Sequence, residues 1–442
     1  MLEKRIKKIT DAWICQVQNE KVVPVFGDLI LENDKIFRIE QKDFDQYLRS
    51  KREKSDAEYS ADGRVITLPL INFHDHFYSR LAKGLPVSGK MDNFVGILEN
   101  LWWKLDLLLD EEMIRASAQM AILESLQQGV TTIFDHHSSP LVAEQSLEII
   151  GEEMEKFGLR GVLCFETTDR NGKELAQQGL QANIDFLSRE NSDLKGVLGL
   201  HASFTLTDET MGKVSEIAEK FNCGVHIHLC EDSADVEISK EKFGAAPAQR
   251  LKKFNLLNEK TLLAHGVHLT DADYEIIEKS GSALIYNPDS NLNNSVGLPR
   301  YAAAPQNIPI LPGTDGMHAN IARTLKQLFL LYRSRSENPD DAFGWLQKIY
   351  FDQLAFVRRY FPDFPNLQQS DRADFIVWDY VPPTPLTREN FWGHFIYGVL
   401  ERPVVDVVHG GNIISPHSVS NDYTELRKEI HKQGRRLFEK FK

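Results

Sequence analysis

The sequence has few of the residues and segments that would place it in several large classes of protein. It has only four cysteines among 442 residues, and Cys15, Cys164, Cys223 and Cys230 form no C-x-x-C pair. We therefore expect reduced core thiols in a cytoplasmic protein, and not a disulfide framework. No apolar run approaches the ~20 residues that cross a bilayer, and no apolar segment follows the basic start at 1–8, so neither a membrane span nor a signal peptide is predicted.

Positive charge is also scarce. Lys and Arg together number 51 against 64 Asp and Glu, which gives a formal net charge of −13. This balance argues against nucleic-acid binding through phosphate neutralisation, so a small molecule is the expected partner. The chain lacks low-complexity tracts and repeats of about 20–50 residues, which excludes a solenoid or a propeller. The sequence leaves open whether the chain forms a homodimer.

What the chain does contain is ample apolar sequence for a large core. Hydrophobic residues make up 42% and charged residues 26%, and 442 residues suit one large barrel with an appended small domain. Both ends read as short strands, with a hairpin tip at Asn33-Asp34, a polar stretch at 42–58 and a terminal amphipathic helix at 420–442. We therefore expect residues 1–66 and 366–442 to form one composite β-sandwich domain, with the barrel at 67–365.

The middle of the chain alternates apolar strand-like runs with helical patterns, for example at 111–128, 141–157, 208–222 and 271–280. This alternation is typical of a parallel α/β fold, and eight such units over roughly 300 residues predict a (β/α)8 TIM barrel. Chemistry in that fold sits at the carboxyl ends of the strands. The eight runs end near His76, His136, Glu166, His201, His228, His265, Pro288 and Asp315.

Two of these runs carry pairs of histidines. His74 and His76 close the apolar run at 65–73, and side chains two residues apart on a strand point the same way. Their imidazoles therefore project together from a strand end, where they could chelate one metal ion. His226 shares a strand face with His228, but it lies one layer deeper and is expected to be a buried core residue.

Further groups at strand ends fit the same ion. His228 ends the fifth run and Glu231 follows it, His265 ends the sixth, and Asp315 ends the eighth. Three imidazoles and a carboxylate suit a single divalent ion such as Zn²⁺, with Fe²⁺ as an alternative, because ligand type alone does not choose between them. Such an ion activates water at neutral pH, with Glu231 as general base and His265 polarising the substrate.

These motifs resemble the amidohydrolase superfamily, in the branch of deaminases and triazine hydrolases, and in particular SsnA-type aminohydrolases. The resemblance implies that His74, His76, His228 and Asp315 bind one metal. It also implies catalytic roles for Glu231, His265 and Asp315, the last taking a proton from the hydrolytic water. The resemblance rests on His74-x-His76, His228-x-x-Glu231, His265-Gly266, Asn287-Pro288-x-Ser290-Asn291 and Gly313-Thr314-Asp315-Gly316.

Several other residues are candidate substrate contacts. His201 ends the fourth strand, where the family places a substrate-contacting His. His137 ends the second strand and is equally explained by a loop hydrogen bond. Arg80 and Arg170 follow strand ends and could clamp an anionic or carbonyl-rich substrate, unless they pair with acidic loop residues. Trp102 lies beside Trp103 in the long insertion at 77–110, which either stacks on a flat ring or packs into the core.

The combined pattern predicts a metal-dependent hydrolase of C–N bonds. The expected reaction is hydrolytic deamination of a nitrogen heterocycle of the purine, pyrimidine or pterin kind. Glu231 favours this reaction, because departing ammonia needs a proton whereas a halide leaving group does not. Two alternatives stay open: a cyclic amide or formimino hydrolase with the same metal site, and a non-catalytic metal-binding barrel.

Overall fold

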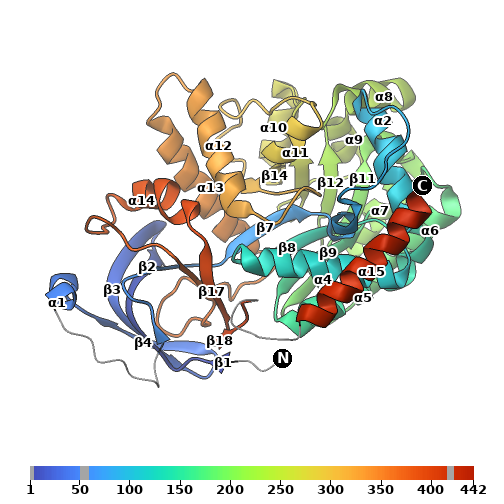
Figure 1. The fold of residues 1–442 in the computed structure, drawn as a ribbon. Coiled ribbons are helices and arrows are strands. Elements are labelled where there is room, and N and C mark those ends of the chain that lie inside the picture. The colour runs from blue at the N-terminus through green and yellow to red at the C-terminus, as the bar shows by residue number, and fades with distance from the viewer. Residues whose placement is uncertain (1–3, 50–58, 416–422) are drawn as a thin grey trace. The chain divides into compact units, whose positions relative to one another are not determined.

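A computed structural model of the chain describes residues 4–49, 59–415 and 423–442 (Figure 1). The chain divides into two compact units, each built from separate stretches of sequence. The first unit consists of Met1–Leu70, Leu123–Thr131 and Phe361–Thr424. The second consists of Ile71–Ile122, Thr132–Tyr360 and Glu425–Lys442. The terminal helix therefore belongs with the second unit, which differs from its expected place in the β domain.

Hydrogen bonds join the strands of the first unit into one mixed sheet. Among the described residues its order is β1-β18-β17-β16-β6-β2-β3-β4, with β5 paired to β2. This single path does not confirm a sandwich of two sheets. The strands are β1 (Lys4–Arg5), β2 (Lys8–Gln18), β3 (Lys21–Glu32), β4 (Lys35–Gln41), β5 (Tyr59–Ser60), β6 (Val65–Thr67), β16 (Phe375–Trp378), β17 (Val404–His409) and β18 (Asn412–Ile413).

Tight turns explain the hairpins of this sheet. Asn19 and Glu20, between β2 and β3, both have positive φ, as a two-residue hairpin loop requires. The expected hairpin turns at Asn33-Asp34, between β3 and β4. Helix α1 (Phe44–Arg49) occupies the start of the polar stretch at 42–58, whose residues 50–58 lie outside the described part of the chain. The unit also contains α14 (Phe391–Tyr397) and η5 (Val399–Glu401).

The second unit is built on parallel strands, as the alternating pattern predicts. They form two hydrogen-bonded groups, β10-β9-β8-β7 and β11-β12-β13-β14-β15. Isolated parallel bridges join Asp75 to Asp315 and Thr167 to Leu200, at the two edges where the groups meet. The strands are β7 (Leu70–Asp75), β8 (Val130–His137), β9 (Arg160–Phe165), β10 (Leu194–Gly196), β11 (Leu198–Ala202), β12 (Val225–Leu229), β13 (Leu262–His265), β14 (Ala283–Tyr286) and β15 (Ile310–Pro312).

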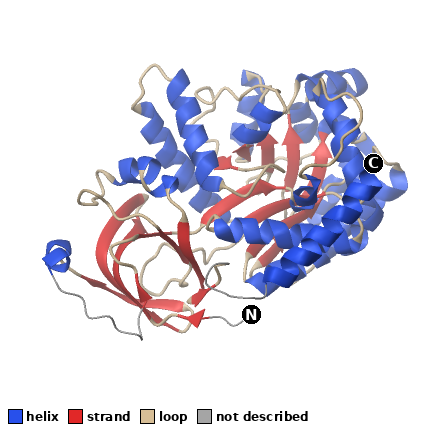
Figure 2. Cartoon of the chain, viewed as in Figure 1, coloured by secondary structure: helices blue, strands red, loops and turns tan. Residues whose placement is uncertain are grey.

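Helices follow these strands and lie outside the parallel sheet (Figure 2). The principal ones are α4 (Glu111–Gln127), α5 (Ala143–Phe157), α6 (Lys173–Leu187), α7 (Asp208–Phe221), α8 (Ser233–Phe243), α9 (Pro247–Lys253), α10 (Asp271–Ser280), α11 (Pro288–Asn293), α12 (Ile321–Arg335), α13 (Asp341–Val357) and α15 (Tyr423–Phe441). Several begin and end as the sequence suggests. Thr270 caps α10 by accepting a hydrogen bond from the Asp273 amide, and left-handed Gly281 ends it.

The segment between β7 and α4 has little regular structure. It contains η1 (Phe77–Ala82), α2 (Phe94–Ile97), the single π-helical turn η2 (Leu98–Trp102) and α3 (Trp103–Asp106). The π-turn inserts an extra residue per turn, and such turns are frequent at functional sites. The eight principal strands of the described second unit are buried along almost their whole length, so the polar residues at their carboxyl ends are the exception that needs an explanation.

Candidate active site

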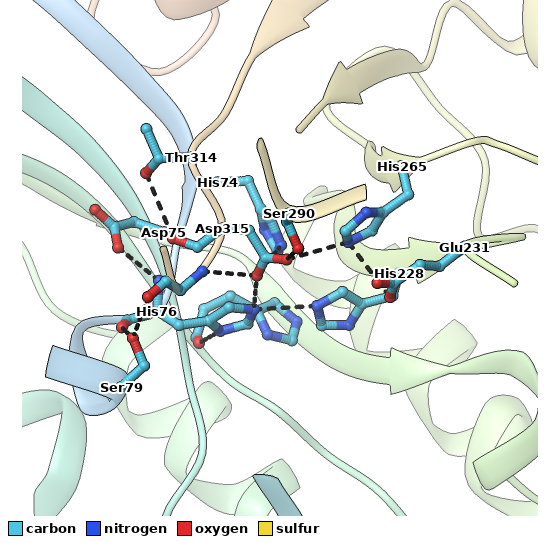
Figure 3. Close-up of polar contacts among 12 residues, drawn as sticks. His74, Asp75, His76, Ser79, His228, Glu231, His265, Ser290, Thr314 and Asp315 are labelled. Carbon is cyan, nitrogen blue, oxygen red and sulfur yellow. Dashed lines mark hydrogen bonds and ion pairs between the residues drawn. The ribbon is translucent and has the colours of Figure 1, made fainter. Parts of the chain in front are cut away.

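The four expected metal ligands come together at the carboxyl ends of their strands (Figure 3). His76 Nε2 lies 2.9 Å from Asp315 Oδ1 and 3.2 Å from His228 Nε2. His74 Nε2 lies 3.6 Å from the same Asp315 oxygen. Asp315 has a left-handed backbone, with φ of 54°, and its parallel bridge to Asp75 ties the loop after β15 to β7. Residues more than 200 positions apart in sequence therefore share one small volume.

The three imidazoles are oriented by hydrogen bonds at their other nitrogen. His76 Nδ1 donates to the His136 carbonyl oxygen at 2.5 Å, and His228 Nδ1 donates to the His201 carbonyl oxygen at 2.8 Å. His74 Nδ1 lies 2.9 Å from His226 Nε2. Because each Nδ1 is occupied, each Nε2 is left to face the centre of the cluster. Partners of this kind fix the tautomer of metal-binding histidines.

The donor set fits a divalent cation. Two groups of side chains have ligand atoms that all lie within 4.8 Å of one another. The first group is His74, His228, His265 and Asp315, and the second is His76, His136 and His228. His74 Nε2 is buried and has no hydrogen-bond partner among the described residues, which a cation would supply. Burial, aided by the neighbouring imidazoles, holds the pKa of His74 and of His228 well below its ordinary value. Both rings are therefore neutral, the form that binds metal.

Asp315 and His76 form the charged part of the cluster. Burial opposes ionisation of Asp315, but the hydrogen bond from His76 holds the pKa of this carboxyl well below its usual range. Burial likewise opposes the charge of His76, yet the Asp315 carboxylate raises the pKa of His76 to about 9. In the absence of a cation, the protonated imidazole neutralises the carboxylate. A cation would replace that proton.

A proton-transfer pair lies beside these ligands. His265 Nε2 is 3.5 Å from Glu231 Oε2 and 3.8 Å from Asp315 Oδ2. His265 Nδ1 is 2.8 Å from Asn291 Oδ1, so the Nδ1 position carries the proton and Nε2 points toward Glu231. Burial raises the pKa of Glu231 to about 6. The Ser290 hydroxyl donates to Asp315 Oδ2 at 2.5 Å. These contacts place a base, an imidazole and a carboxylate around one point.

A pocket opens from this cluster and contains about 800 Å³ of empty space, part of it open to solvent. One wall is apolar and comes largely from the segment between β7 and α4. The described residues of that wall include Phe94, Ile97, Leu98, Trp102, Trp103, Ala202 and Phe204. Trp102, which the sequence offers as a candidate substrate contact, is among these lining residues. Its neighbour Trp103 lines the pocket equally.

The far part of the pocket carries charge. Arg170 lines it and donates to Glu166 Oε1 at 2.9 Å and to Asp106 Oδ2. Asp106 Oδ2 also accepts a hydrogen bond from Ser138 at 3.0 Å. The Arg170 guanidinium lies 5.3 Å from the centre of the Trp103 ring. Burial raises the pKa of Asp106 to about 6.

Two expected substrate contacts are corrected by the structure. The described residues that line the pocket include His201, Arg170 and Trp102 but neither Arg80 nor His137. Arg80 is fully buried and donates to both oxygens of Asp75, at 2.6 and 2.8 Å. It therefore forms the acidic pairing that the sequence left open. His137 is buried against Ser139 at 2.8 Å, because alternation along β8 turns it away from the side that its neighbour His136 faces.

Sequence reasoning missed several residues of the site. Asp106 lies in the irregular segment before α4, where no strand or helix period indicates which side chains face the pocket. Glu166 ends one of the eight apolar runs in the sequence. That position is the one signal that could have identified it as a residue of the pocket. Asp235 lines the pocket from the first turn of α8 and has no sequence signal beyond its position soon after Glu231.

Comparison with known proteins identifies what the chain resembles. The family described as the amidohydrolase family matches residues 65–351. A 5'-deoxyadenosine deaminase from Methanocaldococcus jannaschii is 26% identical over 409 residues, which are 88% of this chain and 90% of that protein. A 5-methylthioadenosine/S-adenosylhomocysteine deaminase from Pyrococcus horikoshii is 28% identical over 330 residues, 72% of this chain and 73% of that protein.

Solved structures share the fold. A mutant of the atrazine chlorohydrolase TrzN from Arthrobacter aurescens TC1, complexed with zinc and atraton, superposes with a TM-score of 0.79 and 17% identity over 97% of this chain and 99% of that one. An adenosine deaminase from Xanthomonas campestris with bound zinc superposes with a TM-score of 0.75 and 17% identity. The match covers 97% of this chain and 98% of that one. The parallel unit therefore has a fold of the TIM-barrel type. In the described residues we find no helix with the length and apolar character to cross a membrane.

Proposed function

The chain belongs to the amidohydrolase family, and we propose that it is a metal-dependent hydrolase of C–N bonds that deaminates a nitrogen heterocycle. A flat substrate is supported by Trp102 and Trp103, which line the same pocket as His76, His228 and Asp315. Relatives that are named deaminases of 5'-deoxyadenosine and 5-methylthioadenosine support a purine-like ring. Pyrimidine and pterin rings have the same flat shape and remain within the proposed class.

One observation carries the proposal: Glu231 and His265 lie 3.5 Å apart, beside a cluster of side chains that fits a cation. A divalent ion held by that cluster would supply Lewis-acid activation of a water molecule at neutral pH. A metal site with a purely structural role needs no proton-transfer pair next to its ligands. The arrangement therefore favours an enzyme over a non-catalytic metal-binding barrel.

In the proposed reaction, water adds to the ring carbon that bears the amino group, and the bond from that carbon to the amino nitrogen breaks. Glu231 accepts one proton from the water and delivers it to the adjacent ring nitrogen. Asp315 accepts the second proton and passes it to the amino group, which leaves as ammonia. His265 Nε2, held in place by Asn291, faces the oxygen of the tetrahedral intermediate.

The proposal extends to the identity and number of the ion. We assign one Zn²⁺ to His74, His76, His228 and Asp315, because their Nε2 atoms and the carboxylate face one another across 2.9–3.6 Å. Zinc-containing neighbours of the same fold support this choice. Fe²⁺ is the alternative, because histidine and carboxylate ligands accept both ions.

We also propose that the parallel strands of the second unit close into one (β/α)8 barrel. The bridges from Asp75 to Asp315 and from Thr167 to Leu200 support closure, because they are parallel and lie where a closed barrel would continue its pairing. Closure would explain why residues at the ends of the first and last strands bind the same ion.

The decisive experiment compares Glu231→Gln with the unchanged protein. We expect the variant to keep one metal ion per chain by elemental analysis but to lose ammonia release by at least about 10²-fold, because the proton shuttle is gone. The substrates are aminated purines, pyrimidines and pterins, tested with the zinc-loaded protein. Glu237→Gln makes the same chemical change at an exposed position on α8 and should leave the rate unaltered.

Three outcomes would count against the proposal. Full activity of Glu231→Gln would exclude the assigned proton transfer. Ring opening without free ammonia would indicate a cyclic amide hydrolase. Two tightly held ions per chain would indicate a further ligand, and His136 is the nearest candidate because it belongs to the second group of donor atoms.

A further inference from the structure

The only arginine or lysine among the described residues that line the pocket is not available to bind an anion. Both terminal nitrogens of Arg170 are already bonded to carboxylates, one to Glu166 at 2.9 Å and the other to Asp106. All three side chains are more than nine-tenths buried. One guanidinium between two carboxylates leaves a net negative charge at this end of the pocket, so Arg170 orders the acidic pair and does not clamp a ligand.

Two further groups at the same end accept hydrogen bonds. Asp106 Oδ1 has no hydrogen-bond partner among the described residues, although its other oxygen has two. The Thr205 hydroxyl donates its single proton to the Ala202 carbonyl oxygen at 3.0 Å, so the 2.8 Å contact of His201 Nδ1 with that hydroxyl must be donated by the ring. The remaining nitrogen of a neutral His201, Nε2, is then an acceptor.

His201 lines the same pocket. The ring lies against the pocket wall, with its centre 6.1 Å from the Trp103 ring and 5.7 Å from the His228 ring. It therefore lies beside one proposed metal ligand and one tryptophan of the pocket wall. The charged side chains Asp106, Glu166 and Arg170 together carry an excess of negative charge, because two carboxylates pair with a single guanidinium.

From this arrangement we infer that the pocket selects heterocycles whose substituents carry neutral or cationic hydrogen-bond donors, such as sugar hydroxyls or an amine, and rejects substituents that carry phosphate or carboxylate. The inference rests on the proposed deaminase function, because it concerns the substrate of the same pocket. It replaces the expectation that Arg170 clamps an anionic substrate. A buried charge of like sign disfavours binding strongly, whereas a donor satisfies acceptors that otherwise lack partners.

The test measures binding, so that it does not depend on turnover. Zinc-loaded Glu231→Gln protein is titrated by calorimetry with adenosine, guanosine and cytidine, with the 5'-monophosphate of each, and with 5'-amino-5'-deoxyadenosine. We expect at least one nucleoside to bind about tenfold or more tightly than its monophosphate, and the amine to bind at least as tightly as adenosine. Equal or tighter binding of every monophosphate would overturn the inference.

Variants then assign the preference to the acidic pair. In Asp106→Asn, added to the same protein, the ratio between nucleoside and monophosphate affinity should fall about tenfold, because one negative charge is removed and part of Arg170 is released. Glu166→Gln removes the other carboxylate charge of the acidic pair. This variant replaces Asp106→Asn in the test if Asp106→Asn does not fold. Asp185→Asn, an exposed position on α6, should leave the ratio unaltered. An unaltered ratio in both pocket variants would overturn the inference.

The two proposals can fail separately. If no nucleoside, nucleotide or amine of the set binds, the inference is wrong, whereas ammonia release from free bases in the substrate screen would leave the deaminase proposal standing. If the charge preference is present but no compound releases ammonia with the unmodified protein, the pocket has the inferred selectivity and the proposed reaction is wrong.

Discussion

At the scale of single residues, the orientation of His265 depends on one buried side chain. Asn291 Oδ1 accepts from His265 Nδ1 at 2.8 Å, and both residues are fully buried. Without that acceptor, the imidazole could take the other tautomer or rotate, and Nε2 would no longer be held 3.5 Å from Glu231 Oε2. Asn291 is therefore a positioning residue for the proposed proton-transfer pair.

We predict that Asn291→Ala lowers kcat about 10–100-fold, with little change in KM and with the metal content retained. Steady-state ammonia release and elemental analysis measure both quantities. Asn307→Ala removes the same amide from an exposed position that does not line the pocket and should behave like the unchanged protein. A loss of metal in Asn291→Ala would instead show that His265 is itself a ligand, as its place in one of the two groups of donor atoms allows.

At the scale of secondary-structure elements, the close approach of β15 and β7 requires a glycine. A Cβ built on Gly313 would lie 2.3 Å from Asn287 Oδ1, 2.8 Å from an Ile285 methyl carbon and 2.9 Å from His74 Cβ. Gly313 has an ordinary negative φ, so the restriction is steric and does not come from backbone conformation. Larger residues would push the strand that carries His74 away from the one that carries Asp315.

We predict that Gly313→Ala destabilises the protein by about 1–3 kcal/mol and weakens zinc retention during dialysis against a chelator. Gly344→Ala is the matched control, because a Cβ at Gly344 in α13 meets nothing within 4 Å. That control should stabilise the helix by about 0.5–1 kcal/mol. Unchanged metal retention in Gly313→Ala would mean that the spacing of the two strands does not limit metal binding.

The strand ends were predictable because burial on both faces of a parallel sheet makes each strand an apolar run, and a polar residue at its end breaks the pattern. His74, His76, His228 and Asp315 stand out in that way. Asp106 could not be found so, because it comes from a single helical turn without a hydrophobic period. The roles of Arg80 and Arg170 depend on carboxylates close in space, and sequence spacing alone does not identify those partners.

At the scale of the whole molecule, the last helix of the chain packs on the same unit as the proposed active site. Helix α15 buries Gln433, Leu437 and Phe441, which are four residues apart and therefore lie on one face. Arg436 and Lys440 both contact Asp110, at 2.8 and 3.0 Å, in the loop before α4. The sequence shows that the helix is amphipathic, but it does not show which unit the apolar face covers.

We predict that Leu437→Ala lowers the free energy of unfolding of the second unit by about 2–5 kcal/mol, because the side chain is fully buried and its removal leaves a cavity. Urea unfolding of the zinc-loaded protein, followed by tryptophan fluorescence together with zinc release, measures the effect on the unit that holds the metal. Leu330→Ala makes the same change on α12, where the side chain is 48% exposed, and should cost less than about 0.5 kcal/mol. Activity well below the unfolding transition should be unaffected in both variants, because neither residue lines the pocket. If Leu437→Ala unfolds like the unchanged protein while zinc release is also unaltered, the helix does not stabilise the unit that carries the ligands.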